Sequence, residues 1–477
     1  MEHFERKMME AGLNQAAIGA FRQNYQALSQ GDTGLLPEGD IAPVTQLPNL
    51  KDLKKQSSPE QVAQLLKKTA VLKLNGGLGT SMGLDKAKSL LEVKEGHTFL
   101  DLIAMQIKDM RKRFGAEVKF VLMNSFSTSE DTNRYMDEKH GDLAKGGYLE
   151  LMQNKSPKVD LKTMLPATYP ENPDLEWCPP GHGDIYPSLL GTGMLDKLIQ
   201  DGIEYVFVSN SDNLGATLDV DLLAHFASKD MPFMMEVCER TESDKKGGHL
   251  CVTRKSGKLT LRESAMCPAE DMDAFQDIEK HRFFNTNNLW LNLSKLKSVL
   301  EKNNGVLPLP LIKNKKTINP RDDTTAAVYQ LETAMGSAIE AFDGAGAVCV
   351  PRSRFAPVKT CNDLFALRSD AYLVTDDFRV VLAEGVMKPP VVKLDDPFYK
   401  KVDKFDRLVK GQVSLRQCNR LTVVGPALFE EGVVLKGTVE FVNEDGTPAT
   451  IEGSRTYENG CFKPQDGVFP SSPAKKF

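Results

Sequence analysis

A glycine-rich stretch followed by two lysines is the first feature of this sequence that could do chemistry. An apolar run that begins at Ala70 leads into Leu74-Asn75-Gly76-Gly77, and Lys86 and Lys88 follow closely. Glycine lets backbone N–H groups close around oxygen anions, and lysine adds positive charge. The stretch lacks the spacing of a Walker A loop and of a G-x-G-x-x-G dinucleotide fingerprint. We therefore expect a phosphate-binding loop of another kind, with a ligand-free glycine turn as the alternative.

A lone carboxylate stands at a position that suits a divalent cation. Asp212 follows the apolar run Glu204–Ser209, which reads as a buried strand. Mg²⁺ prefers one or two carboxylates together with substrate phosphates, and the end of a strand presents such a group well. The alternative is an Asx-turn residue with no ligand. Five histidines, at 97, 140, 225, 249 and 281, show no metal-ligand spacing and receive no role.

Three further clusters carry polar groups in loops. One is the turn Pro179–Asp184, which holds a histidine between two glycines; another is Pro351–Lys359, with three cations. The third is Phe284–Trp290, whose amides offer paired donors and acceptors that suit sugar hydroxyls. Each cluster alone could equally be a solvated loop or a turn. Together they indicate a nucleotide, a metal ion and a sugar, a combination in which positioning and charge neutralisation supply most of the catalysis.

The composition limits the class of protein. The 477 residues exceed one ordinary core and predict two or three domains, while 41% hydrophobic and 26% charged residues are typical of a globular chain. A net charge of -5 argues against non-specific nucleic-acid binding. The eight cysteines form no C-x-x-C pair, and the sequence shows no apolar leader or long apolar run. We expect free thiols, no membrane partner and a cytoplasmic location.

The elements that must position these groups can be placed along the chain. Apolar residues at helical spacing predict an amphipathic lead-in over residues 1–30, and a connector follows to residue 48. Ser58-Pro59-Glu60-Gln61 predicts a capping box at the start of a second helix. Short apolar runs then alternate with segments of helical length, and the predicted strands are Ala70 onward, Lys119–Met123, Glu204–Ser209, Phe233–Cys238 and Ala347–Val350.

This alternation predicts an α/β fold with a mixed, mostly parallel, Rossmann-like sheet covered by helices. Ligands in such sheets bind outside the carboxyl ends of the strands, where the polar clusters fall. The pattern changes near Pro389: a helix is expected over 393–409, followed by an all-β tail that is either a meander or a short β-helix. We therefore expect a lead-in over 1–55, a catalytic unit over 56–388 and a β unit over 389–477.

Seven motifs in a fixed order carry a family resemblance. The chain resembles the eukaryotic-type UTP–glucose-1-phosphate uridylyltransferases, also called UDP-glucose pyrophosphorylases. The resemblance implies a nucleotidyltransferase domain followed by a C-terminal left-handed β-helix. The matching motifs span roughly residues 70 to 370, and they are Leu74 to Gly83, Leu122 to Phe126, Pro179 to Asp184, Asn210 to Gly215, Asn285 to Trp290, Gln330 to Ala334 and Pro351 to Phe355.

The resemblance also implies a set of site residues. Lys359 matches the catalytic lysine, Lys88 the lysine that reaches the phosphates, and Asp212 the Mg²⁺ ligand. Gln153 and Gly181 match positions that contact uracil. The expected nucleotide contacts are Leu74, Asn75, Gly76, Gly77, Gln153, Gly181 and Asp212. The expected substrate contacts are His182, Asn210, Ser211, Glu263, Asn285 and Asn287, of which the last three lie where the family recognises glucose.

One departure from the family concerns the first lysine. The family usually reads G-P-K-S there, whereas this chain has Lys86-Ala87-Lys88-Ser89. The loss of proline relaxes the constraint on φ at this position of the loop. The alternative is therefore that Lys86 shares the phosphate-binding role expected of Lys88 or takes it over.

The implied activity is reversible and Mg²⁺-dependent: UTP and glucose 1-phosphate give UDP-glucose and pyrophosphate. The alternatives are a UDP-sugar or UDP-N-acetylhexosamine pyrophosphorylase with another sugar preference, and a non-catalytic sugar-nucleotide sensor. The sequence leaves the oligomeric state open, between a closed monomer and a homo-oligomer formed through the C-terminal unit.

Overall fold

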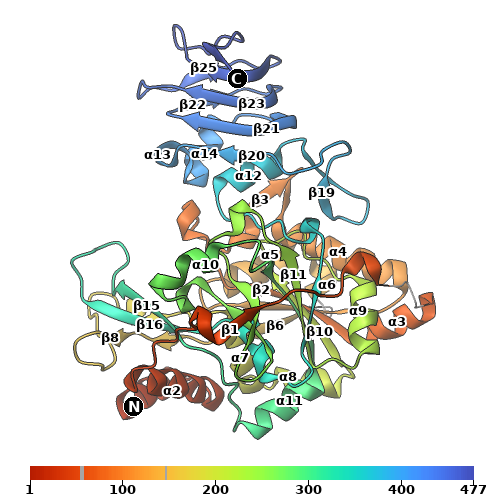
Figure 1. Ribbon diagram of the computed structural model, residues 1–477, viewed down its shortest axis with the longest axis vertical. Helices are drawn as coiled ribbons and strands as arrows, with labels where there is room; N and C mark the ends of the chain where they lie inside the picture. Colours follow the sequence, from red (N-terminus) through yellow and green to blue (C-terminus); the bar gives the residue numbers. More distant parts are fainter. Residues whose placement is uncertain (54–57, 145–147) are drawn as a thin grey trace.

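The molecule is elongated, with N-terminal helices toward one end and C-terminal strands stacked at the other (Figure 1). The computed structural model describes residues 1–53, 58–144 and 148–477. The predicted boundary between the lead-in and the catalytic unit, at residues 55 and 56, lies outside the described residues. Among the helices in the described ranges, none has both the length and the apolar character that crossing a bilayer requires.

In the described part of the chain, a ten-stranded sheet forms the centre of the catalytic unit. Seven of its strands make up its middle, and these run in one direction except β14, which is antiparallel to its neighbours β10 and β11. The predicted α/β class with a mostly parallel sheet is therefore confirmed. In spatial order the strands are β6 (Tyr148–Met152), β5 (Lys119–Asn124), β2 (Thr69–Asn75), β10 (Tyr205–Asn210), β14 (Phe283–Asn292), β11 (Phe233–Glu239) and β17 (Gly346–Cys349).

Successive residues of the strands alternate between two hydrophobic cores. On β2, Val71 packs into one core, and Leu72 packs into the other. The Val71 core is covered by α3 (Pro59–Lys67), α4 (Phe99–Phe114) and α9 (Val220–Ser228), and the Leu72 core by α7 (Ile185–Gly191), α8 (Met194–Gln200) and α11 (Leu293–Lys302). A sheet buried on both faces explains why its strands read as continuous apolar runs.

The N-terminal helices form where the sequence predicts them. Helices α1 (Glu2–Glu10) and α2 (Gln15–Ser29) pack through the rings of Phe4, Phe21 and Tyr25. They cover a small sheet of β8 (Val159–Asp160), β16 (Ala327–Glu332) and β15 (Ile312–Thr317). The capping box of α3 is present, since Ser58 accepts from the Gln61 backbone and Gln61 from the Ser58 backbone.

The C-terminal unit is built from parallel strands. Strands β20 (Val391–Lys393), β21 (Ser414–Val424), β23 (Val434–Val442) and β25 (Thr456–Phe462) pair in parallel, as do β22 (Ala427–Phe429) and β24 (Ala449–Ile451). This pairing excludes the antiparallel meander. Four aromatic rings surround Phe441 in the interior, those of Phe429, Tyr457, Phe462 and Phe469.

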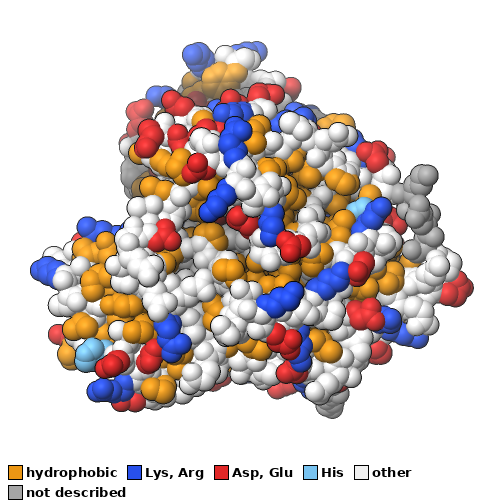
Figure 2. Space-filling view, turned by 60° about the horizontal axis from the view of Figure 1, so that its bottom comes forward, with side chains coloured by type: hydrophobic (Ala, Val, Ile, Leu, Met, Phe, Trp, Pro, Cys, Tyr) orange, Lys and Arg blue, Asp and Glu red, His pale blue; other side chains and the backbone are white. Residues whose placement is uncertain are grey.

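The prediction of a single helix over 393–409 is wrong. The segment begins as β20 because it pairs with β21, and two short helices follow, α13 (Asp396–Tyr399) and α14 (Val402–Leu408). The Tyr399 hydroxyl donates to the Ala427 carbonyl at 2.6 Å, which ties the end of α13 to the β unit. All eight cysteines are free thiols, as expected. On the face shown in Figure 2, acidic and basic side chains are interspersed.

The connector before β1 (Ile41–Pro43) is anchored by a buried arginine. Strands β12 (His249–Thr253) and β13 (Leu259–Arg262) extend the sheet beyond β14, and Arg262 there is 0% exposed. Its guanidinium pairs with Glu38 at 2.6 Å and with Asp271 at 3.2 Å, while Lys280 contacts Glu38 at 2.7 Å. Burial raises the pKa of the Glu38 carboxyl, but Lys280 and His281 outweigh it and lower the value to about 2.

We predict that Glu38→Gln destabilises the fold by about 3–5 kcal/mol at pH 7, because it leaves a buried guanidinium with one partner fewer. Since the pKa of Glu38 is lowered, its stabilisation is complete above about pH 4.3, the ordinary glutamate value, and declines as the pH falls toward about 2. Urea unfolding midpoints at pH 7 and pH 3 check this. Glu239→Gln, in an exposed pair with Arg282, is the control and should cost less than about 1 kcal/mol. Equal midpoints for both variants would contradict the assignment.

Candidate active site

The carboxyl ends of β2 and β10 lie side by side and form the floor of the site. Leu74 and Asn210 are partners in the parallel register, and the Ser211 amide donates to the Leu74 carbonyl at 3.1 Å. The chain leaves both strands here, into the glycine-rich loop and into the Asp212 turn. The structure thus brings together the two features that the sequence separates by more than a hundred residues.

Two lysines converge on Asp212. Lys88 Nζ lies 2.7 Å and Lys359 Nζ 3.2 Å from the same oxygen, Asp212 Oδ2. Lys88 also donates to the Val358 carbonyl at 2.5 Å, next to Lys359. Burial raises the pKa of the Asp212 carboxyl, but Lys359 and Lys88 outweigh it and hold the value below its usual range. The carboxylate is therefore ionised at neutral pH.

The second oxygen of Asp212 is available for a cation. Oδ1 is buried and has no hydrogen-bond partner within the described part of the chain. A buried carboxylate oxygen without a donor is costly, and a bound Mg²⁺ would satisfy it. In the same described ranges, no group of three or more histidine, cysteine or carboxylate side chains could hold a metal ion. The donor set fits an ion that is shared with substrate phosphates and does not fit a closed structural metal site.

Lys86 and Lys88 differ in environment. Lys88 begins a short 3₁₀ turn, its amide donates to the Gly77 carbonyl at 3.0 Å, and its side chain is 14% exposed. Lys86 is exposed. The structure therefore places Lys88 at the Asp212 carboxylate.

A glycine allows the next group to approach the loop. A Cβ added at Gly76 would lie 2.6 Å from Gln153 Oε1, and the Gln153 amide donates to the Gly181 carbonyl at 3.2 Å. These contacts bring together three of the expected nucleotide residues. Asn75 differs, because its side chain is buried and donates to Asn124 and Thr132, so this side chain is engaged within the protein.

The turn that carries His182 is fixed by the segment after β16. The Gly183 amide donates to the Thr333 carbonyl at 2.8 Å, and the Met335 amide donates to His182 Nδ1 at 2.9 Å. Burial and the charge of Lys359 lower the pKa of His182 to about 4. The imidazole is neutral at physiological pH, and because Nδ1 accepts, Nε2 carries the hydrogen and is the donor.

A β-bulge shapes the sugar side of the site. The register between β11 and β14 shifts after Glu236, and Asn287 within the bulge has a φ of 59°. The bulge lets the Asn285 amide donate to Asn287 Oδ1 at 2.9 Å. Glu263 lies beside Asn285; burial raises the pKa of its carboxyl, and the bond from Asn285 offsets part of that rise. The expected sugar-binding residues therefore gather at one place.

A buried ion pair missed by the sequence reasoning supports these groups. Glu236 is 0% exposed and accepts from Arg354 at 2.7 and 2.8 Å and from the Trp290 indole at 3.0 Å. The Arg354 carbonyl accepts from Asn213 at 3.2 Å. The pair thereby fixes both the segment leading to Lys359 and the Asp212 turn. A glutamate inside the apolar run of β11 was the only signal in the sequence.

A second missed residue is a lysine inside β2. Lys73 is 2% exposed, and its Nζ donates to Ser209 Oγ at 2.8 Å and to the Ala216 carbonyl at 2.6 Å. These contacts join both ends of the turn that carries Asp212. Burial and the nearby Arg354 lower the pKa of Lys73 to about 7. A charged residue within an otherwise apolar strand could have drawn attention to it.

Similar proteins assign the chain to a family. A family model described as UTP–glucose-1-phosphate uridylyltransferase matches residues 19–436. The chain belongs to this family. The uridylyltransferase of Saccharomyces cerevisiae is 41% identical over 402 residues, which cover 84% of this chain and 79% of that protein. The Hordeum vulgare protein is 41% identical over 401 residues, covering 83% and 81%. The chain is thus an enzyme of the nucleotidyltransferase class.

Solved structures agree with this assignment. A mutant of the UDP-glucose pyrophosphorylase from Leishmania major, in complex with UDP-glucose, superposes with a TM-score of 0.91 at 47% identity and covers 97% of this chain and 99% of that chain. A protein from Trypanosoma brucei described as a UDP-glucose phosphorylase superposes with a TM-score of 0.89 at 48% identity, with the same coverage. The match extends over the C-terminal unit as well.

We predict that Lys88→Ala and Lys86→Ala separate the roles of the two lysines. Removal of one preorganised cation from a reacting phosphate typically lowers kcat by about 10²–10³-fold, so Lys88→Ala should lose that much activity. Lys86→Ala should stay within about two-fold of wild type, because an exposed side chain that forms no ion pair with the described residues contributes little. Steady-state kinetics measures kcat for both variants, and thermal unfolding shows whether each variant is folded. The reverse order of effects would contradict the assignment of Lys88.

Proposed function

We propose that the chain joins UTP and glucose 1-phosphate to form UDP-glucose and pyrophosphate, in a reversible reaction. The observation that carries this proposal is the convergence of Lys88 and Lys359 on the buried Asp212 at the ends of β2 and β10. Family membership, and the complexes of relatives with UDP-glucose, support the choice of substrates.

The proposed reaction is an in-line displacement. A phosphate oxygen of glucose 1-phosphate attacks the α-phosphorus of UTP, a new P–O bond forms, and the bond to the departing pyrophosphate breaks. Lys88 and Lys359 neutralise the charge that collects on the phosphates, since both ammonium groups lie at the same oxygen of Asp212. Lys359 is the more exposed of the two, which suits a side chain that follows the leaving group.

We propose that Mg²⁺ is the cofactor and that Asp212 Oδ1 is its protein ligand. Asp212 would hold the ion, which when bound would supply positive charge against the negative charge of the substrate phosphates. This assignment is supported by Asp212 Oδ1, which is buried without a hydrogen-bond partner in the described part of the chain. The small number of protein ligands that Mg²⁺ usually takes supports it as well.

Base and sugar recognition follow from amide groups on either side of the phosphates. We propose that Gln153 and Gly181 recognise uracil, because a carboxamide next to a backbone N–H offers the acceptor and donor that its edge needs. Glu263, Asn285 and Asn287 supply acceptors and donors for hydroxyls of glucose, with His182 as a further donor. We further propose that the parallel C-terminal strands form a short β-helix.

We predict that glucose 1-phosphate is the preferred sugar. Pyrophosphate release with UTP should be fastest with glucose 1-phosphate and slower, by about ten-fold or more, with the galactose and N-acetylglucosamine 1-phosphates, since a lost or misplaced hydroxyl leaves a buried amide unpaired. Equal or faster release with another sugar would favour the alternative pyrophosphorylases. Absence of release with all three would favour a non-catalytic sensor. Lys359→Ala, expected to lower kcat by about 10²–10³-fold, is the control that ties release to this site.

We predict that the metal dependence follows Asp212. Chelation with EDTA should abolish turnover, and added Mg²⁺ should restore it. Asp212→Asn should raise the Mg²⁺ concentration for half-maximal activity by at least about ten-fold, because a neutral amide oxygen is a weaker ligand than a carboxylate. An unchanged Mg²⁺ titration in a folded Asp212→Asn variant would remove Asp212 from the metal site.

A further inference from the structure

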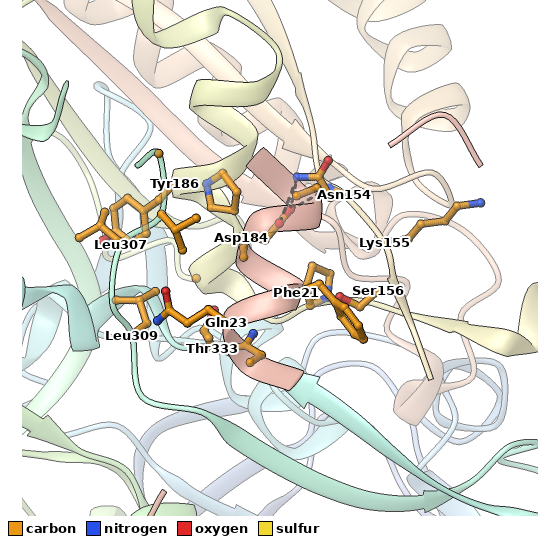
Figure 3. Close-up of a pocket in the computed structure, with 18 residues that line it drawn as sticks. Phe21, Gln23, Asn154, Lys155, Ser156, Asp184, Tyr186, Leu307, Leu309 and Thr333 are labelled. Carbon is orange, nitrogen blue, oxygen red and sulfur yellow. Dashed lines mark hydrogen bonds between the residues drawn. The ribbon is translucent and has the colours of Figure 1, made fainter. Parts of the chain in front are cut away.

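Asp184 is a buried carboxylate behind the proposed uracil site and takes no part in the reaction proposed above. Asp184 is 4% exposed and ends the turn that carries Gly181 and His182. Its carboxylate accepts from the Asn154 backbone amide at 2.7 Å, from the Asn154 side chain at 3.1 Å and from the Ser188 hydroxyl at 2.8 Å. Figure 3 shows Asn154 and Asp184 facing each other, joined by their hydrogen bonds.

The carboxylate joins two chain segments that also pair with each other nearby, as strands β7 (Ser156–Pro157) and β9 (Trp177–Cys178). Asn154 directly follows Gln153, and Asp184 lies three residues after Gly181. Since Gln153 also donates to the Gly181 carbonyl at 3.2 Å, the bonds to Asp184 act one residue away from Gln153 and three residues away from Gly181, the groups proposed to read the base. A shift of Asn154 would therefore move Gln153 against Gly181.

The N-terminal helices complete this support. Asn14 caps α2 by accepting from the Ala17 amide at 2.9 Å, and its side-chain nitrogen donates to Asn154 Oδ1 at 3.2 Å. Asn154 is thus held from both sides, by a carboxylate and by an amide. The cavity behind it, partly lined by Phe21 and Asn24 of α2, measures about 30 Å³ (Figure 3). That space suits about one water molecule and no nucleotide.

The chemistry of this position requires a carboxylate. Asp184 receives three donors, all from neutral groups, and both of its oxygens are used. An asparagine of the same shape would replace one acceptor oxygen by an NH₂ group, which would face a donor of Asn154 or Ser188. Burial raises the pKa of Asp184, and the hydrogen bonds from Ser188 and Asn154 limit the rise, so that the pKa is about 6. The side chain is therefore ionised at neutral pH.

We propose that Asp184 is a positioning residue that sets Gln153 against Gly181 and thereby determines the selectivity for the uracil base. This inference rests on the proposed function, because it takes Gln153 and Gly181 as the base-reading pair. Asp184 itself does not touch the substrate. Its influence reaches the base through the backbone of Asn154 and through the turn at His182.

The test is Asp184→Asn, which preserves the volume of the side chain. Loss of a hydrogen bond to a charged group corresponds to roughly a ten-fold to hundred-fold change, so the KM for UTP should rise by about that factor. The KM for glucose 1-phosphate should stay within about two-fold, and kcat should fall much less than the KM for UTP rises. The ratio of kcat/KM for UTP to that for CTP should fall by about ten-fold, because only the correct base uses the fixed geometry.

A matched control separates positioning from stability. Asp101→Asn removes another buried carboxylate, which accepts from the Thr98 amide at 2.8 Å and from the Tyr135 hydroxyl at 2.9 Å, at the start of α4. It should lower the thermal unfolding midpoint and leave the base ratio unchanged. A lowered midpoint with an unchanged base ratio in Asp184→Asn as well would overturn the proposal, since Asp184 would then stabilise the fold alone.

Two measurements keep the inference open to refutation. If Asp184→Asn fails to fold, Asn154→Ala removes the same side-chain bond more gently, and an unchanged UTP-to-CTP ratio in that variant would overturn the proposal. Equilibrium binding of UTP to wild type and Asp184→Asn, without sugar, does not depend on turnover. Weaker UTP binding in the variant would support the positioning role even if no UDP-glucose is formed, so the failure of the proposed function and that of this inference can be told apart.

Discussion

The charge balance at Asp212 is the constraint on which the rest of the structure depends. One largely buried carboxylate holds two lysines that come from opposite ends of the catalytic unit, and only one of its oxygens serves them. Two cations facing one anion leave a local surplus of positive charge in a chain whose net charge is -5. Phosphates are therefore attracted by local groups, in a site where the whole-protein field would repel them.

A rigid polar layer beneath the site maintains this balance. Lys73 donates hydrogen bonds to both ends of the turn that carries Asp212. The Glu236–Arg354 pair holds the segment that leads to Lys359. Buried charges of this kind stabilise a fold only weakly in net terms, because desolvation offsets their attraction. Their more specific contribution here is geometric, since each of them has partners on separate strands or loops that carry catalytic groups. The preorganised cations of the site rely on that geometry.

Much of the fold could be predicted from the sequence, and the failures have physical causes. The strands β2, β5, β10, β11 and β17 were predictable because burial on both faces makes them predominantly apolar. Strand β14 was not, because the amides of its first half read as a turn, and only the bulge at Asn287 shows why they sit in a strand. Among the motif residues, the structure brings Lys88, Asp212 and Lys359 together, and also Gly76, Gln153 and Gly181. Lys73 and Glu236 stand out as charged residues within apolar strands, but the partners of these residues and of Asp184 depend on three-dimensional packing, which a linear pattern does not specify.

The close approach of Gly76 to Gln153 has a consequence for how such a site can evolve. A methyl group at position 76 would overlap the Gln153 carboxamide, and a side chain at Gly181 would meet the Thr333 backbone, 2.5 Å away. A substitution at Gly76 therefore requires the Gln153 carboxamide to move, and one at Gly181 requires the backbone at Thr333 to shift. Evolution at the proposed base-reading edge is constrained by these neighbours, whereas an exposed position such as Lys86 can change one residue at a time.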